Sequence, residues 1–158
     1  MRPIGLTTLF FPSLLPAVVT GIYIKGRVGN ELRELAKEKG SLTIEDVYHV
    51  TTMHYLGEEP IDNFESILRS LSTPLSGVRV LEIGSGFAGD ARVLASRTGC
   101  KINCVEIQEH ISEQAEALSS QLKMSHLVRT DETSYPSLSL SLSRHVDAAV
   151  GFSCSPAP

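Results

Sequence analysis

Three glycines, placed between an apolar strand and a helix, constrain this chain more than any other feature. Residues 78–83 form a short apolar run, Gly84 and Gly86 lie in the turn that follows, and a helix is expected over residues 89–97. Gly84 permits a tight turn, Gly86 lets a ligand approach bare backbone, and Gly89 allows the helix to pack closely on the strand. The pattern predicts a strand, turn and helix with a ligand site at the strand's carboxyl end.

The elements around this unit alternate between strand and helix, which predicts a parallel sheet with right-handed crossovers. Further strands are expected at residues 101–107, 127–129 and 146–152, with a helix at residues 109–122. Upstream, helices are expected at residues 28–39, 43–56 and 62–71. Thr43 can cap the second of these, and Asp62 with Glu65 forms a capping pattern for the third. Residues 137–143 alternate serine and leucine and fit an edge strand or a loop, of which we favour the loop.

Composition limits the class of protein. The 158 residues suit about one domain, and the net charge of -4 without a basic block gives no sign of a nucleic-acid partner. Cys100, Cys104 and Cys154 lack a CxxC spacing, so free thiols in a reducing compartment are expected. The apolar stretch 6–24 has the length of a signal peptide or membrane anchor, but Pro12 and Pro16 interrupt it, and we favour an apolar leader.

Two glutamates stand at the ends of expected strands. Glu106, 20 residues after Gly86, could accept hydrogen bonds from both hydroxyls of a ribose, and its alternative is a solvated charge. Glu82 could contact a ligand ammonium or orient the turn through water, and its alternative is a solvated acid. Asp90, just after the third glycine, disfavours a phosphate at the turn because two anions would repel each other.

Residues 80–95, VLEIGSGFAGDARVLA, resemble motif I of class I methyltransferases. The resemblance is greatest to the phosphoethanolamine, sarcosine and tocopherol methyltransferases, which read V-L-D/E-x-G-x-G-x-G-G-x-A-R-x-L-A. Ala88 stands where that group has the first glycine of a pair. The run from Val105 to Ile107 is similar to the group's acidic strand end, which holds the ribose, and Asp131 stands where an acid often lies near the adenine amino group.

Two shorter segments extend the resemblance to about residues 48–152. Asp147 begins a segment similar to the group's F-D-x-V on the fourth strand. Residues 54–57, HYLG, resemble an H-Y-x-G segment whose tyrosine helps to close the site; an ordinary helix end with an interfacial Tyr55 explains them equally well.

The resemblance implies an α/β, Rossmann-like class I methyltransferase fold, incomplete, with about four parallel strands and N-terminal helices. It divides the chain into an apolar leader (1–27), a helical cap (28–75) and a partial S-adenosylmethionine-binding domain (76–158). The cofactor would be S-adenosylmethionine, the partner a small-molecule methyl acceptor, and the location cytoplasmic, with no metal. The expected cofactor-binding residues are Glu82, Gly84, Ser85, Gly86, Glu106, Ile107 and Asp131.

No catalytic base can be named from the five histidines, which are His49, His54, His110, His126 and His145. Because this fold normally has seven strands, we expect a truncated chain with weak or absent catalysis. Two alternatives stay open: a domain of an NAD-dependent oxidoreductase, against which Glu82 and Asp90 argue, and a non-catalytic protein that pairs through the open edge of its sheet.

Overall fold

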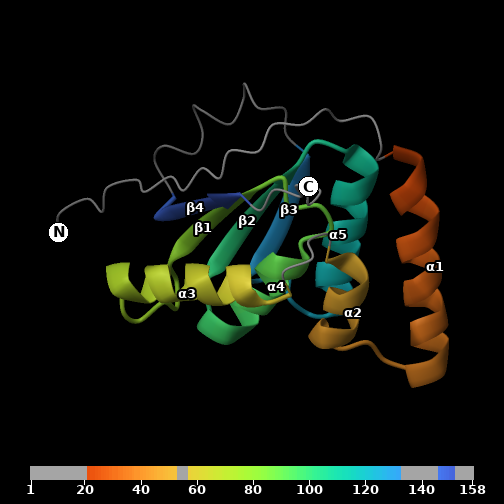
Figure 1. Cartoon of the computed structure of the whole chain (residues 1–158), viewed down its shortest axis with the longest axis horizontal. Helices are drawn as coiled ribbons and strands as arrows, with labels where there is room; N and C mark the ends of the chain where they lie inside the picture. Colours follow the sequence, from red (N-terminus) through yellow and green to blue (C-terminus); the bar gives the residue numbers. More distant parts are fainter. Residues whose placement is uncertain (1–20, 53–56, 133–145, 152–158) are drawn as a thin grey trace.

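The computed structural model describes residues 21–52, 57–132 and 146–151 (Figure 1). Three helices come first along the chain: α1 (Gly21–Lys39), α2 (Ile44–Thr51) and α3 (Glu59–Leu71). Strands and helices then alternate, in the order β1 (Arg79–Ile83), α4 (Gly89–Thr98), β2 (Lys101–Glu106), α5 (Glu109–Gln121), β3 (Val128–Glu132) and β4 (Ala148–Gly151).

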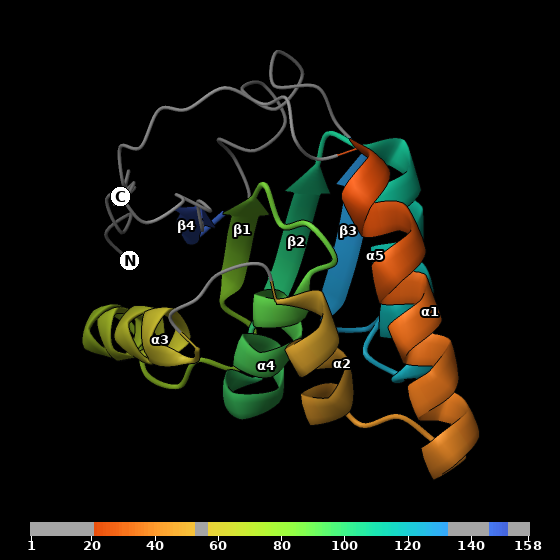
Figure 2. The same cartoon turned by 45° about the vertical axis from the view of Figure 1, so that its right-hand side comes forward.

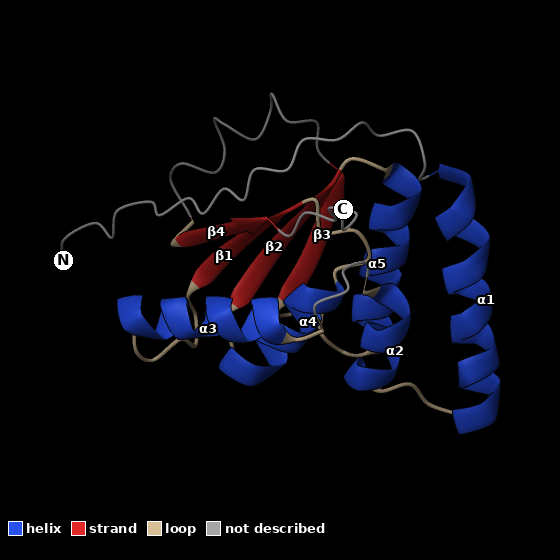
Figure 3. Cartoon of the chain, viewed as in Figure 1, coloured by secondary structure: helices blue, strands red, loops and turns tan. Residues whose placement is uncertain are grey.

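The strands form one parallel sheet in the order β3-β2-β1-β4 (Figure 3). The chain steps outward from β1 to β2 to β3 and then returns to the other side of β1 with β4. The turn between β1 and α4 therefore lies where the strand order reverses, which is where open parallel sheets bind ligands. The prediction of a Rossmann-like fold with about four parallel strands and N-terminal helices is confirmed.

Side chains alternate between the two faces of the sheet, and one face carries the main core. Val80 and Ile102 belong to the same apolar cluster as side chains of α3, α4 and α5. Leu81 and Val105 form a separate cluster with the opposite parity. Around α4, helices α2 and α3 pack from outside, and α1 packs on α2 at the outer edge of the helical layer (Figure 2).

The N-terminal cap of α2 agrees with the prediction, whereas the starts of α1 and α3 do not. Thr43 caps α2 as expected: its hydroxyl accepts from the Asp46 N–H at 3.2 Å, and its own N–H donates to the Asp46 carboxylate at 3.0 Å. The predicted start of α3 at Asp62 is wrong, because the helix begins at Glu59 with Pro60 in its first turn. Helix α1 begins at Gly21 rather than at residue 28.

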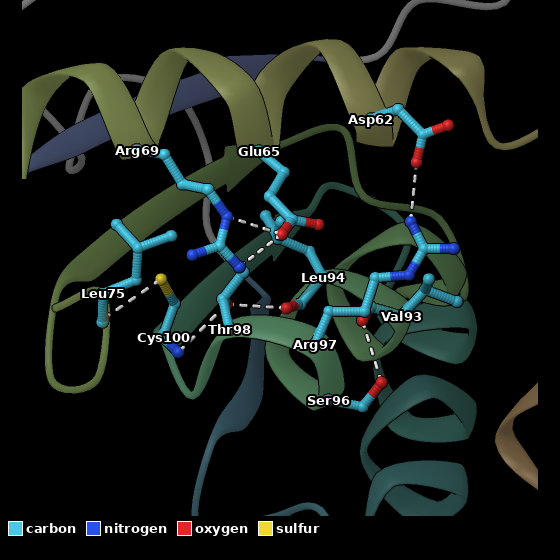
Figure 4. A network of polar contacts seen from close by, with 10 residues as sticks. All are labelled: Asp62, Glu65, Arg69, Leu75, Val93, Leu94, Ser96, Arg97, Thr98 and Cys100. Atoms are coloured by element: carbon cyan, nitrogen blue, oxygen red, sulfur yellow. Dashed lines mark hydrogen bonds and ion pairs between the residues drawn. The ribbon is translucent and has the colours of Figure 1, made fainter. Parts of the chain in front are cut away.

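Asp62 and Glu65 do not form the predicted cap and instead pair with arginines (Figure 4). Arg97 on α4 donates to Asp62 Oδ1 at 2.7 Å and also contacts Glu58, so the two acids tie α3 to α4. Glu65 pairs with Arg69 along α3 at 2.6 Å.

The cysteines within the described residues are buried and reduced. Cys100 donates its thiol to the Leu75 carbonyl at 3.4 Å, beside Thr98 (Figure 4). Cys104 lies inside the sheet on β2. Free thiols are confirmed for these two, whereas Cys154 lies outside the described residues.

Residues 1–20 of the predicted leader (1–27) and the serine–leucine segment 137–143 also lie outside the described residues. The predicted leader boundary at residue 27 is wrong, because residues 21–27 belong to α1. Across residues 21–52, 57–132 and 146–151, no helix is both long and apolar enough to cross a bilayer. The same residues contain no cluster of three or more metal-ligating side chains.

Candidate functional site

The turn between β1 and α4, residues 84–88, has a left-handed backbone at three positions. Gly84 has φ of 71° and Gly86 has φ of 54°, a conformation that glycine adopts without the clash a Cβ causes. A Cβ added at either glycine would meet no atom of the described residues within 4 Å. We call this turn the glycine loop. At Gly84 and Gly86 its backbone carries no side chain and faces open space among the described residues.

The close packing at Gly89 involves a different element from the one predicted. A Cβ at this position would lie 2.9 Å from the Thr51 hydroxyl and 3.6 Å from the Tyr48 ring, both on α2. The prediction that Gly89 allows close packing on the strand is wrong in its partner, because the close approach is between α4 and α2. The absent side chain thus lets the helical cap dock on the helix that follows the loop.

Four of the five backbone N–H groups of the glycine loop donate within the protein. The N–H groups of Gly84 and Ser85 donate to the Val105 carbonyl, at 2.8 and 3.2 Å. The Ala88 N–H donates to the Ser85 carbonyl at 2.9 Å, and the Gly86 N–H donates to Glu106. Turns that bind phosphate aim such groups at the ligand instead. These four N–H groups are not available for a pyrophosphate in this arrangement.

Glu106, at the end of β2, is fixed beside the loop. Its Oε2 accepts from the Gly86 N–H at 3.0 Å, and its Oε1 accepts from the Gln108 N–H at 2.9 Å. The residue is 6% exposed, so the alternative of a solvated strand-end charge is wrong. A carboxylate offers about four acceptor positions, so about two stay free beside the glycines.

Glu82 lies beneath the loop, on the face of the sheet that the helices cover. It is 2% exposed and pairs in register with Cys104, whose thiol donates to Glu82 Oε2 at 3.5 Å. Burial raises the pKa of Glu82 to about 8, with Asp90 adding to the rise and Cys104 and Arg92 opposing it. The alternative of a solvated acid is therefore wrong, and the carboxyl is protonated at neutral pH.

Two other predicted cofactor-binding residues, Ile107 and Asp131, make no hydrogen bond to the glycine loop in the part of the chain that the structure describes. Ile107 follows β2 directly and is 63% exposed. Asp131 is exposed on β3, with Arg129 at 4.0 Å. Because Asp131 pairs in register with Val105, whereas Glu106 pairs with Glu132, the side chains of Asp131 and Glu106 project from opposite faces of the sheet. The structure brings Gly84, Ser85, Gly86 and Glu106 together, but it does not bring Asp131 to them.

Arg92 is a site residue to which the sequence analysis gave no role. It is 1% exposed on α4, and its guanidinium donates to the Phe87 carbonyl of the glycine loop at 2.5 Å. On the other side it donates to Ser119 Oγ at 3.2 Å and to the Ala115 carbonyl at 3.4 Å, both on α5. Burial lowers the pKa of Arg92 to about 10, so it stays a cation. A signal was present in the sequence, because Arg92 stands directly between the apolar residues Ala91 and Val93.

Within the described residues, no histidine side chain makes a hydrogen bond to the loop. His49 and His126 are exposed, and His110 lies in the first turn of α5. His54, Tyr55 and His145 lie outside the described residues.

Comparison with known proteins identifies solved structures that are similar to this chain. No family model matches the sequence, and the search of curated proteins gave no match. A methyltransferase from Thiobacillus denitrificans, solved with S-adenosyl-L-homocysteine, is 23% identical with a TM-score of 0.40, over 48% of this chain and 29% of that one. A protein from Galdieria sulphuraria assigned as a sarcosine dimethylglycine methyltransferase is 19% identical with a TM-score of 0.46, over 60% and 40%.

A third similar structure is the [4+2]-cyclase SpnF, at 19% identity and a TM-score of 0.39, over 46% of this chain and 27% of SpnF. The matched part of this chain thus spans less than half the length of each of the three.

Proposed function

We propose that this chain is the S-adenosylmethionine-binding part of a class I methyltransferase that acts on a small-molecule acceptor. The observation that carries the proposal is the contact between the Gly86 N–H and Glu106 Oε2 at 3.0 Å, next to an open loop surface. It places an acid with free acceptor positions directly beside bare backbone. A nucleoside lying over the glycines would have its ribose hydroxyls within reach of that acid.

The donor set fits S-adenosylmethionine better than a dinucleotide. Four of the five loop N–H groups, which could otherwise donate to a pyrophosphate, donate within the protein. Asp90, 8% exposed in the first turn of α4, adds a negative charge at the helix end where a phosphate would bind. S-adenosylmethionine has no phosphate and needs neither the donors nor the helix end.

The chain's own residues would bind and orient the ligand. Glu106 would hold the ribose, Gly84 and Gly86 would admit the nucleoside, and the exposed side chain of Ile107 would lie against the base. The bound cofactor supplies a methyl group activated by its sulfonium, so the protein's share of catalysis is mainly alignment. Asp131 remains a prediction from the resemblance alone, and Glu82, which is 2% exposed, would orient the loop from beneath rather than contact the ligand.

The proposal includes the wider organisation of the chain. Residues 76–158 would form the cofactor-binding part and residues 28–75 a helical cap, docked where α2 meets Gly89. The buried, reduced thiols of Cys100 and Cys104 fit a reducing compartment, so we propose a cytoplasmic location.

Calorimetry on the 158-residue chain separates the two cofactor classes. We expect S-adenosylhomocysteine to bind and NADH to give no heat under the same conditions. Binding of NADH alone would contradict the proposal in favour of an oxidoreductase, and binding of neither ligand would contradict a cofactor site.

A further inference from the structure

We infer that Arg92 is a positioning residue for the glycine loop: it holds the Phe87–Ala88 peptide in place and fixes the loop against α5. The inference deepens the proposed function and rests on it for the identity of the ligand. Arg92 itself does not reach the loop's open surface, because it is 1% exposed within α4.

The peptide that Arg92 holds is the point at which the loop turns into α4. Its carbonyl, on Phe87, accepts from Arg92 Nη2 at 2.5 Å, and its N–H, on Ala88, donates to the Ser85 carbonyl at 2.9 Å. Ala88 has φ of 56°, a left-handed conformation that a residue with a Cβ adopts only at an energetic cost. A strained residue of this kind persists only where its surroundings hold it, and Arg92 supplies one of the two bonds to this peptide.

The same guanidinium reaches α5. Ser119 and Ala115 lie one turn apart on that helix, are both fully buried, and accept from Nη1 at 3.2 and 3.4 Å. A guanidinium has donors directed to several sides, so one side chain can contact the loop and α5 together. The short ammonium of a lysine is a single point of contact and cannot replace this geometry.

These contacts complete a second anchor for the loop. The first anchor joins Gly86 to Glu106, at the end of β2. The second joins Phe87 through Arg92 to α5, the helix that follows that strand, and the buried Phe87 belongs to the same apolar cluster as Ile111 of that helix. Both anchors lead to the β2–α5 unit, so the distance between the glycines and the ribose-holding acid depends on both.

Amide hydrogen exchange of wild type and Arg92→Lys tests the inference. The reporters are the amides of Gly84, Ser85, Gly86 and Ala88, each of which donates within the protein. In Arg92→Lys we expect the protection of Gly86 and Ala88 to fall by about tenfold or more, while β1 and β2 amides keep theirs. Affinity for S-adenosylhomocysteine, measured on the folded variant, should fall by about tenfold as well.

Two further variants keep the test decisive. Ser119→Ala removes one contact on α5 and should lower loop protection by about threefold, so it decides the matter if Arg92→Lys does not fold. Arg69→Lys changes an exposed arginine on α3 that pairs with Glu65, and it should leave the loop unchanged. Equal loss of protection across β1, β2 and the loop, or an unchanged loop, would overturn the inference.

Failure of the proposed function would look different. If wild type did not bind S-adenosylhomocysteine, the ligand assignment would be wrong, but the exchange pattern would still decide whether Arg92 fixes the loop.

Discussion

Glu82 on β1 and Cys104 on β2 are neighbours in the parallel register, and the Cys104 thiol donates to the Glu82 carboxyl at 3.5 Å. Both residues are buried beneath α4, which also carries Asp90 and Arg92. The acid at the end of β1 is therefore an internal group, and its ionisation is coupled to folding.

Stability should consequently depend on pH through Glu82. Its pKa is about 8 in the folded chain, compared with an ordinary value of 4.5. Between these values the folded state holds one more proton than the unfolded state, so the free energy of unfolding should fall as pH rises. The slope is at most about 1.4 kcal/mol per pH unit, and the loss is complete above the folded pKa. Urea unfolding at intervals from pH 5 to 9 measures it.

Glu82→Gln is the matched variant, because an amide keeps an acceptor for Cys104 but cannot ionise. We expect its stability to exceed that of wild type by a margin that grows through the same pH window. Glu113→Gln, at an exposed position on α5, serves as the control and should follow wild type. Parallel profiles for Glu82→Gln and wild type would show that Glu82 does not titrate with folding.

Gly89→Ala should destabilise the chain by about 1–3 kcal/mol, because the new methyl meets the Thr51 hydroxyl at 2.9 Å. Thr51 is buried and donates to the Val47 carbonyl, so it has little freedom to move away. Adding Thr51→Ala should recover about 1 kcal/mol or more in a double-mutant cycle. Gly29→Ala on α1, where a Cβ meets nothing, should instead stabilise by up to about 1 kcal/mol. Additivity of the Gly89 and Thr51 changes would refute the contact.

The docking of α3 should depend on its apolar face rather than on its ion pairs. Phe64 is 5% exposed in the main core, and Phe64→Ala should cost about 3–5 kcal/mol. Arg97 is partly exposed where it meets Asp62 and Glu58, and Arg97→Ala should cost less than about 1 kcal/mol. Chemical unfolding of the two variants ranks the contributions, and the reverse order would contradict this account.

The sequence was most informative where a local pattern has one physical solution. Alternating strands and helices favour a parallel sheet, and glycines after a strand favour a sharp turn, so the fold and the position of the glycine loop could be predicted. Glu106 could be placed beside Gly86 because consecutive parallel strands end at the same edge of a sheet.

The remaining site features depend on packing between distant segments. That Gly89 faces α2, and that Arg92 bridges the loop and α5, follow from tertiary contacts across 38 and 27 positions in the chain. Glu82 and Asp131 were read as acids near a strand end, but the face onto which each side chain projects decides its surroundings. A one-residue change in register exchanges those faces, and a single sequence does not fix the register to that accuracy.

The proposed role of Glu106 in holding the ribose beside the glycine loop is tested most directly by calorimetry. S-adenosylhomocysteine is titrated into wild type, Glu106→Ala and Glu106→Gln. We expect Glu106→Ala to lose about 1–3 kcal/mol of binding free energy, the scale for losing a charged acceptor. Glu106→Gln, which keeps the shape and one acceptor oxygen, should lose less. Equal affinity in wild type and Glu106→Ala, with both folded, would contradict the account.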